Sequence, residues 1–274
     1  MAITAADVNK LRQQTGAGMM DCKNALVEAD GDFDKAVDIL RKKGQKVAAK
    51  RSDRDAAEGL VIGKTTADNK RGVLIVLNCE TDFVAKNEDF VAFANKIVDL
   101  AIEKNPADLN ALLALNFDGK TVAEKITEEV GKIGEKIELS AYETVEAAHV
   151  VAYNHPGNKI ASIVGLNKDG FAEVAKEMAM QVAAMNPVAV DKDDVPQSVV
   201  EKELEIGREV AAQEGKPAEM LDKIAQGKLN RFFKESTLLN QDFIREHKKS
   251  IRQYLQEKDK ELTVTEFKRI SLAN

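Results

Sequence analysis

Two adjoining segments decide how this chain is interpreted: residues 72–77 (GVLIVL) and residues 79–87 (CETDFVAKN). The first is a short apolar run, as expected of a buried strand. A helical pattern of apolar residues starts at Phe90, so the second segment is a loop held between two fixed elements. An apolar ring, Phe83, beside a carboxylate, Asp82, in such a loop is typical of a protein-binding site.

A purely structural interpretation of the same pair is equally compatible with the residues. Aspartate often caps the start of a helix, so Asp82 could cap the following helix while Phe83 folds back beneath it. The sequence pattern alone leaves the two interpretations evenly matched.

The composition indicates a globular protein with a protein partner. The chain has 274 residues, 44% apolar and 31% charged, which is enough for two or three domains. The net charge of −6, the 5% aromatic content and the lack of Trp argue against a protein that coats nucleic acid. Cys22 and Cys79 are far apart, which argues against a disulfide framework or a cysteine metal site and favours buried, inert thiols.

No targeting or membrane segment is expected from the sequence. The first residues lack a basic stretch followed by an apolar one, and no apolar run is long enough to span a bilayer. We therefore predict a cytoplasmic protein that has no membrane contact. The three histidines are not spaced as ligands on one helix face, so no metal and no cofactor are predicted.

Residues 1–54 are predicted to form an N-terminal three-helix bundle followed by a linker. Turn signals at Gly16, at Gly31 and at Gly44 end the three helices. The basic residues 46–54 then form the linker, which is solvated in the simplest interpretation and could contact RNA in another.

Residues 55–139 and 140–274 are predicted as two similar α/β subdomains with antiparallel sheets, which makes the fold class α+β. Each has a strand followed by a helix that ends at Asn-Pro, at Asn105 and again at Asn186. Only the first subdomain has a Thr-Asp-Phe loop between strand and helix, which suggests a functional role for that loop.

The second of these subdomains carries a predicted insertion. Residues from about 191 to 228 are highly charged with a narrow apolar stripe, and residues 215–217 (GKP) interrupt them. This pattern predicts an antiparallel helical hairpin of the coiled-coil type. A helix spanning Ile244 to Leu255 and a strand at residues 264–270 are expected after it.

Residues 59–65 (GLVIGKT) invite comparison with a phosphate-binding loop. That motif needs four residues between its glycines, and here there are three. The residues are also strand-like, so an ordinary hairpin strand is favoured and no direct nucleotide binding is predicted.

Two further positions have both a structural and a functional interpretation. One of the adjacent methionines Met19 and Met20 can face a core while the other faces elsewhere, so helix packing and an exposed partner patch are equally favoured. His155 lies in a turn between two predicted strands. A turn residue with a free ring is the simpler interpretation, and a contact with a partner is the alternative.

Several segments resemble the bacterial elongation factor Ts family, which comprises guanine-nucleotide exchange factors for elongation factor Tu. They are residues 11–23 (LRQQTGAGMMDCK), 81–87 (TDFVAKN), 132–137 (KIGEKI), 215–217 (GKP) and 227–229 (GKL). The resemblance covers nearly the whole chain and keeps the order of the motifs. Some members of the family continue into a further C-terminal module, whereas this sequence stops at residue 274, which puts only the contacts of that module in doubt.

The resemblance implies an exchange factor that binds elongation factor Tu in its GDP form and makes or breaks no bond, so no catalytic residue is expected. It implies a UBA-like N-terminal bundle that contacts the partner. The implied contacts in the bundle are Leu11, Met19, Met20 and Lys23.

The same resemblance assigns a role to the loop. Asp82 and Phe83, flanked by Thr81 and Val84, would wedge between two helices of the partner's nucleotide domain and disturb its magnesium and phosphate site. Two other functional classes stay open: an RNA- or ribosome-associated protein that uses the basic linker, and a small-molecule enzyme, which would need a pocket with convergent polar groups.

Overall fold

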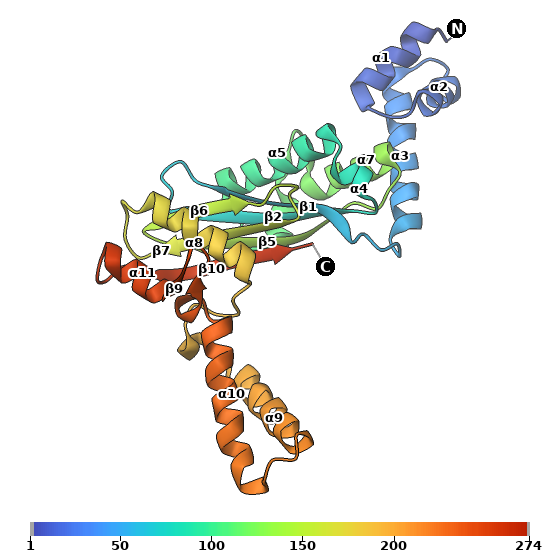
Figure 1. Ribbon diagram of the computed structural model, residues 1–274. Coiled ribbons are helices and arrows are strands. Elements are labelled where there is room, and N and C mark those ends of the chain that lie inside the picture. Colours follow the sequence, from blue (N-terminus) through green and yellow to red (C-terminus); the bar gives the residue numbers. More distant parts are fainter. Residues whose placement is uncertain (1–2, 273–274) are drawn as a thin grey trace. The chain divides into compact units, whose positions relative to one another are not determined.

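The computed structural model describes residues 3–272, and the first two and last two residues of the predicted terminal domains lie outside the described part. The chain forms two compact units. The first comprises Met1–Ile62, Leu74–Glu143 and Ser271–Asn274, and the second comprises Gly63–Val73 and Thr144–Ile270. Helices and antiparallel strands are combined in the chain, which confirms the α+β class (Figure 1).

The first unit begins with helices α1 (Ala5–Thr15), α2 (Met19–Glu28) and α3 (Phe33–Arg51). Thr4 and Asp7 form a capping box that starts α1, and Gly16 ends it in the left-handed conformation with φ 68°. The three helices share a small apolar core that consists of Val8, Leu11, Cys22, Ala25, Leu26, Ala29 and Ala36.

The prediction that residues 46–54 form a linker is wrong over most of that range, because α3 continues through Gly44 to Arg51. Gly44 is buried and lies against Gly131 of helix α7 (Val122–Ile133). A Cβ on Gly131 would come within 2.5 Å of the Cα of Gly44. The glycine therefore allows two helices to approach closely and does not end a helix.

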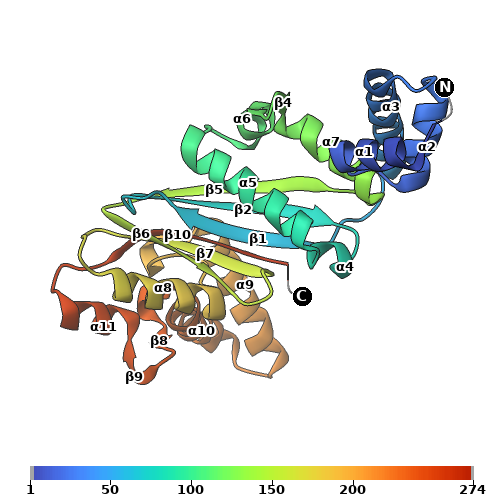
Figure 2. The same ribbon diagram turned by 90° about the horizontal axis from the view of Figure 1, so that it is seen from above.

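The sheet that runs through the first unit contains β1 (Glu58–Thr65), β2 (Arg71–Cys79) and β5 (Glu138–Glu146), in the order β1-β2-β5. Figures 1 and 2 show helices α5 (Glu88–Lys104) and α7 over one face of this sheet. All residues of β2 after Arg71 are buried, as the apolar run predicts. The glycine-rich residues 59–65 lie in β1, which confirms the strand and contradicts the phosphate-loop interpretation.

Short elements connect α5 to α7. Asn105 ends α5 in the left-handed conformation with φ 48°, immediately before Pro106. The connecting elements are α6 (Leu109–Ala114), β3 (Asn116–Phe117) and β4 (Lys120–Thr121). Thr121 and Glu124 then form the capping box that starts α7, and the helix ends at Gly134.

The second unit contains a three-stranded sheet in the order β10-β7-β6. Its strands are β6 (His149–Asn154), β7 (Ile160–Leu166) and β10 (Val264–Ser271), and β6 and β7 pair antiparallel. Helix α8 (Ala172–Met185) packs its apolar face into the core of this unit, together with residues of β7 and α11 (Ile251–Lys258). Like α5, α8 ends at a left-handed asparagine followed by proline.

Helices α9 (Gln197–Gln213) and α10 (Leu221–Ser236) lie side by side as a hairpin in the second unit (Figures 1 and 2). They pack closely at Gly207, where a Cβ would lie 3.0 Å from the Cα of Ala225. The second arm is longer than expected, since α10 runs to Ser236 and passes the predicted boundary at about 228. Three short 3-10 turns flank or connect these helices: Lys192–Asp194, Ala218–Met220 and Leu238–Asn240.

The helix predicted from Ile244 to Leu255 is wrong in its first half. β8 (Asp242–Phe243) and β9 (Glu246–Ser250) form a small antiparallel pair there. The helix α11 begins only at Ile251, because Ser250 and Gln253 form a capping box that fixes its start.

Candidate functional site

The segment after β2 forms a single helical turn, α4 (Asp82–Ala85). Thr81 is its N-cap, and its Oγ1 accepts a hydrogen bond from the N–H of Val84 at 3.4 Å. The side chain of Phe83 is 83% exposed, so it does not fold back beneath the following helix. The structural interpretation, in which Asp82 caps and Phe83 packs inside, is therefore wrong on both residues.

Asp82 is the first residue of α4, where a carboxylate interacts favourably with the helix dipole. Lys86 donates to its Oδ2 at 2.6 Å, one helical turn later. This bond raises the pKa of Lys86. Val84 is half-buried beside the exposed ring of Phe83. The turn thus presents one apolar ring next to one ion pair.

Hydrogen bonds from the chain between α7 and β5 fix the base of this loop. The carboxylate of Glu135 accepts from the backbone N–H of Glu80 at 3.1 Å, from that of Thr81 at 3.0 Å, and from the Thr81 hydroxyl at 2.7 Å. In return, the carboxylate of Glu80 accepts from the N–H of Lys136 at 2.6 Å and from the guanidinium of Arg51 at 2.7 Å.

These bonds change the chemistry of Glu80. The N–H of Lys136 and then the guanidinium of Arg51 stabilise its charged form and lower its pKa below the ordinary value of 4.5. Glu80 is thus a carboxylate that stabilises the base of the loop through these two bonds.

Glu135 is a site residue that sequence reasoning missed. Its motif, residues 132–137, contributes to the family resemblance, yet a glutamate after a helix-ending glycine carries no chemical signal of its own. Its role becomes visible only when the fold brings it to the base of the loop.

Helix α2 presents an exposed apolar surface. Met19 is 52% exposed and Met20 is 62% exposed, so neither faces the core, and of the two alternatives the packing one is wrong. Val27 is 56% exposed and follows Met20 by two helical turns, with Lys23 exposed between them. Val27 was missed, although its seven-residue spacing from Met20 was a usable signal.

Leu11 does not belong to this surface. Its side chain is 0% exposed in the apolar core of the bundle. The predicted contact of Leu11 with a partner is therefore corrected: Leu11 stabilises the bundle that carries α2.

His155 lies in the turn between β6 and β7, as predicted, and is exposed. Its Nδ1 is 3.0 Å from the hydroxyl of Tyr153, and the two rings are tilted with centroids 6.0 Å apart. The ring therefore has a neighbour in its own hairpin and is at the same time exposed to solvent.

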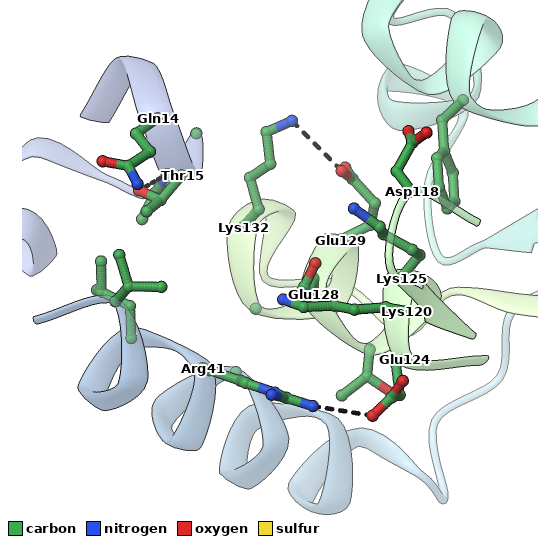
Figure 3. Close-up of a pocket in the computed structure, with 18 of the residues that line it drawn as sticks. Gln14, Thr15, Arg41, Asp118, Lys120, Glu124, Lys125, Glu128, Glu129 and Lys132 are labelled. Atoms are coloured by element: carbon green, nitrogen blue, oxygen red, sulfur yellow. Dashed lines mark hydrogen bonds and ion pairs between the residues drawn. The ribbon is translucent and has the colours of Figure 1, made fainter. Parts of the chain in front are cut away.

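A cavity of about 590 Å³ opens in the first unit among the α1–α2 turn, α3, α5 and α7 (Figure 3). Several of its charged side chains form ion pairs with one another, which resembles a solvated interface between helices more than a centre where polar groups converge. The pairs drawn are Arg41 with Glu124 at 2.8 Å, Lys132 with Glu129 at 3.4 Å, and Lys120 with Glu128.

Cys22 and Cys79 are both buried, as predicted. Within residues 3–272, no group of three or more His, Cys, Asp or Glu side chains could hold a metal ion. No helix in the same part of the chain is long and apolar enough to cross a membrane.

Known proteins resemble this chain over nearly its full length. It is 54% identical to elongation factor Ts of Christiangramia forsetii over 272 residues, covering 98% of both chains. It is 54% identical to elongation factor Ts of Amoebophilus asiaticus over 273 residues, covering 98% of this chain and 99% of the relative. Elongation factor Ts of Flavobacterium psychrophilum is 52% identical over 272 residues, with 98% of both chains covered.

A family comparison agrees with these relatives. Residues 80–274, which begin at the base of the exposed loop, match the family described as Elongation factor TS. Together with the matches over nearly the whole chain, this means that the protein belongs to the elongation factor Ts family.

Proposed function

We propose that this chain is a guanine-nucleotide exchange factor of translation elongation. It binds elongation factor Tu in its GDP form and promotes release of GDP, so that GTP can bind. The observation that carries the proposal is Phe83, an aromatic ring that is 83% exposed on a hydrogen-bonded turn of a chain from the elongation factor Ts family.

The proposed mechanism is a wedge. Asp82 and Phe83 enter between two helices of the partner's nucleotide domain and disturb its magnesium and phosphate site. Burying a phenylalanine side chain contributes about 2–3 kcal/mol, which can offset part of the cost of separating those helices. The carboxylate of Asp82 adds negative charge near a site built for phosphate, which disfavours retention of GDP.

The thermodynamics of exchange need no bond chemistry. If the factor weakens the partner's hold on GDP by some ratio, GDP weakens the partner's hold on the factor by the same ratio. The factor stabilises a nucleotide-free partner, lowers the barrier to GDP release and is then displaced by GTP. We accordingly propose that the chain is no enzyme, acts in the cytoplasm, and binds neither nucleotide nor nucleic acid itself.

The remaining contacts follow the predicted domain division. Residues 1–54 act as a UBA-like docking bundle through Met19, Met20 and Lys23, whose exposure on α2 supports this role. Residues 55–139 carry the wedge. Residues 140–274 add the hairpin and a partner contact at His155.

The test is release of fluorescently labelled GDP from purified elongation factor Tu. We expect the protein to accelerate release at catalytic concentrations, Asp82→Ala/Phe83→Ala to be strongly impaired, and Met185→Ala, which alters an exposed apolar side chain elsewhere, to act like the unaltered protein. Unchanged GDP release at saturating protein would overturn the proposal.

A further inference from the structure

We infer that Glu135 is a positioning residue for exchange, which holds the Asp82-Phe83 turn in the orientation that enters the partner. This inference rests on the proposed function, because it assigns a supporting role to a residue outside the wedge itself.

The contacts of Glu135 are unusually dense for one half-buried side chain. Its two carboxylate oxygens accept three hydrogen bonds, two from consecutive backbone N–H groups at Glu80 and Thr81 and one from the Thr81 hydroxyl. Hydrogen bonds to a charged acceptor are stronger than neutral ones. Three of them on two consecutive residues fix both the path of the backbone and the rotamer of Thr81.

The position of Thr81 in turn determines that of Phe83. The Thr81 hydroxyl donates its hydrogen to Glu135 and uses its oxygen to accept the N–H of Val84. That second bond caps α4, whose second residue is Phe83. A change at Glu135 therefore reaches the exposed ring through one hydroxyl group and one helical turn.

A reciprocal contact adds to these bonds. The hydrogen bonds between residues 80–81 and residues 135–136 are together called the clasp. Glu80 lies next to Thr81 and accepts the N–H of Lys136, the residue after Glu135. Each of the two segments thus places a carboxylate on a backbone N–H of the other. Arg51, in the last turn of α3, also binds Glu80 and connects the end of the bundle's third helix to the clasp.

Positioning matters here because the wedge has few contacts of its own. A ring that is 83% exposed is held by its backbone and not by packing. A site on such a turn functions only if surrounding bonds preorganise it, and a displacement of about 1 Å can lower a rate by roughly 100-fold. Loss of the clasp should therefore slow the step that the wedge performs and leave docking by other surfaces intact.

The experiment measures labelled GDP release from elongation factor Tu as a function of factor concentration, which separates the maximum rate from the half-saturating concentration. The variants are Glu135→Ala, Glu135→Gln and Phe83→Ala. The matched control is Glu138→Ala, which removes an exposed carboxylate three residues away that pairs with Lys136. Amide hydrogen exchange at Glu80 and Thr81 in the free protein reports on the clasp directly.

We expect Glu135→Ala to lower the maximum rate roughly tenfold or more, with the half-saturating concentration within about twofold, as expected if docking is independent of the clasp. Glu135→Gln should restore most of the rate, since its amide oxygen can accept the two N–H bonds and its NH₂ can donate to Thr81. Glu138→Ala should match the unaltered protein. Amide exchange at residues 80 and 81 should be faster in Glu135→Ala and near normal in Glu135→Gln.

Each contrary result has a distinct meaning. A normal maximum rate for Glu135→Ala beside an impaired Phe83→Ala, or unchanged amide exchange at residues 80 and 81, would overturn the inference and leave the proposed function standing. A normal rate for Phe83→Ala would overturn the proposed wedge, and the role of Glu135 in exchange with it. If Glu135→Ala does not fold, Glu135→Asp carries the test: it keeps the charge on a shorter side chain, and a normal maximum rate would overturn the inference.

Discussion

Gly44 and Gly131 bring two helices, α3 and α7, into backbone contact. A Cβ added at Gly131 would lie 2.5 Å from the Cα of Gly44, and one added at Gly44 would lie 3.3 Å from the Cα of Gly131. Contacts below 3.0 Å force the backbone to move. We therefore predict that Gly131→Ala separates the helices and lowers the free energy of unfolding by roughly 1–3 kcal/mol, as overpacking does elsewhere.

The measurement is urea denaturation followed by circular dichroism. The matched control is Gly227→Ala in α10, where an added Cβ has no neighbour within 4 Å. Alanine is the better helix former by roughly 1 kcal/mol, so Gly227→Ala should be neutral or stabilising. Equal stability of the two variants would show that the contact between α3 and α7 contributes little.

The wedge should be dispensable for folding. We predict that Asp82→Ala/Phe83→Ala changes the free energy of unfolding by no more than roughly 1 kcal/mol, because Phe83 is 83% exposed and Asp82 is a half-exposed side chain in a surface ion pair. The comparison variant is Phe90→Ala, whose ring is fully buried in the first turn of the following helix α5 and whose loss should cost roughly 3–5 kcal/mol. Denaturation midpoints of the three proteins decide the matter, and a large loss for the double variant would make the turn part of the core.

Parts of this architecture follow from the sequence, and other parts depend on contacts between distant residues. The strand β2 and helix α5 are local patterns and appear as predicted. The predicted end of α3 is too early, because Gly44 allows a close approach to Gly131, far along the chain, and does not end the helix. A single sequence carries no sign of that pairing.

The site shows the same division. The motif around Phe83 could be recognised from the sequence, but spacing alone could not decide whether the Phe83 side chain is exposed. Thr81 settles it by capping α4, since the turn then points the ring outward. The hydrogen bonds of Glu135 could not be predicted from the sequence, because all three join this residue to residues 80 and 81, far away in the chain.

The hairpin is predicted to be removable. The buried residues of α9 and α10 are Gly207, Ala211, Ala225 and Leu229, and none of them belongs to the apolar cluster of the second unit. We expect replacement of residues 203–229 by a short Gly/Ser linker to leave a cooperatively folding protein, with GDP exchange weakened but not abolished. Calorimetry that shows a lost unfolding transition would place the hairpin within the core.

The α2 surface yields a prediction on binding. Met20→Gln and Met19→Gln should leave the melting temperature within a few degrees, because both side chains are exposed, and should weaken binding to elongation factor Tu. Leu26→Gln on the same helix is fully buried and should instead unfold the bundle. Affinity by titration calorimetry and melting by circular dichroism separate the two effects, and strong melting losses for Met19→Gln and Met20→Gln would mean that these side chains support the fold.

The last prediction concerns pH and Glu80, whose side chain is 14% exposed. Its pKa in the folded protein lies below the ordinary value of 4.5, chiefly because of the Lys136 N–H and then Arg51. The unfolded chain therefore binds this proton more readily than the folded one. The ionised group stabilises the fold fully above pH 4.5, and this stabilisation is lost as the pH falls through the lower pKa of the folded state.

Glu80→Gln should consequently be less stable than the unaltered protein at pH 7 and at pH 5, and the difference should narrow below about pH 4.5. Because Arg51 contributes the second bond, the effect of Glu80→Gln should be smaller in a protein that already carries Arg51→Met. Urea denaturation of the four proteins of this cycle between pH 3.5 and pH 7 measures both effects. A difference that stays constant with pH, or one that is unaffected by Arg51→Met, would show that the charge of Glu80 does not hold the base of the loop.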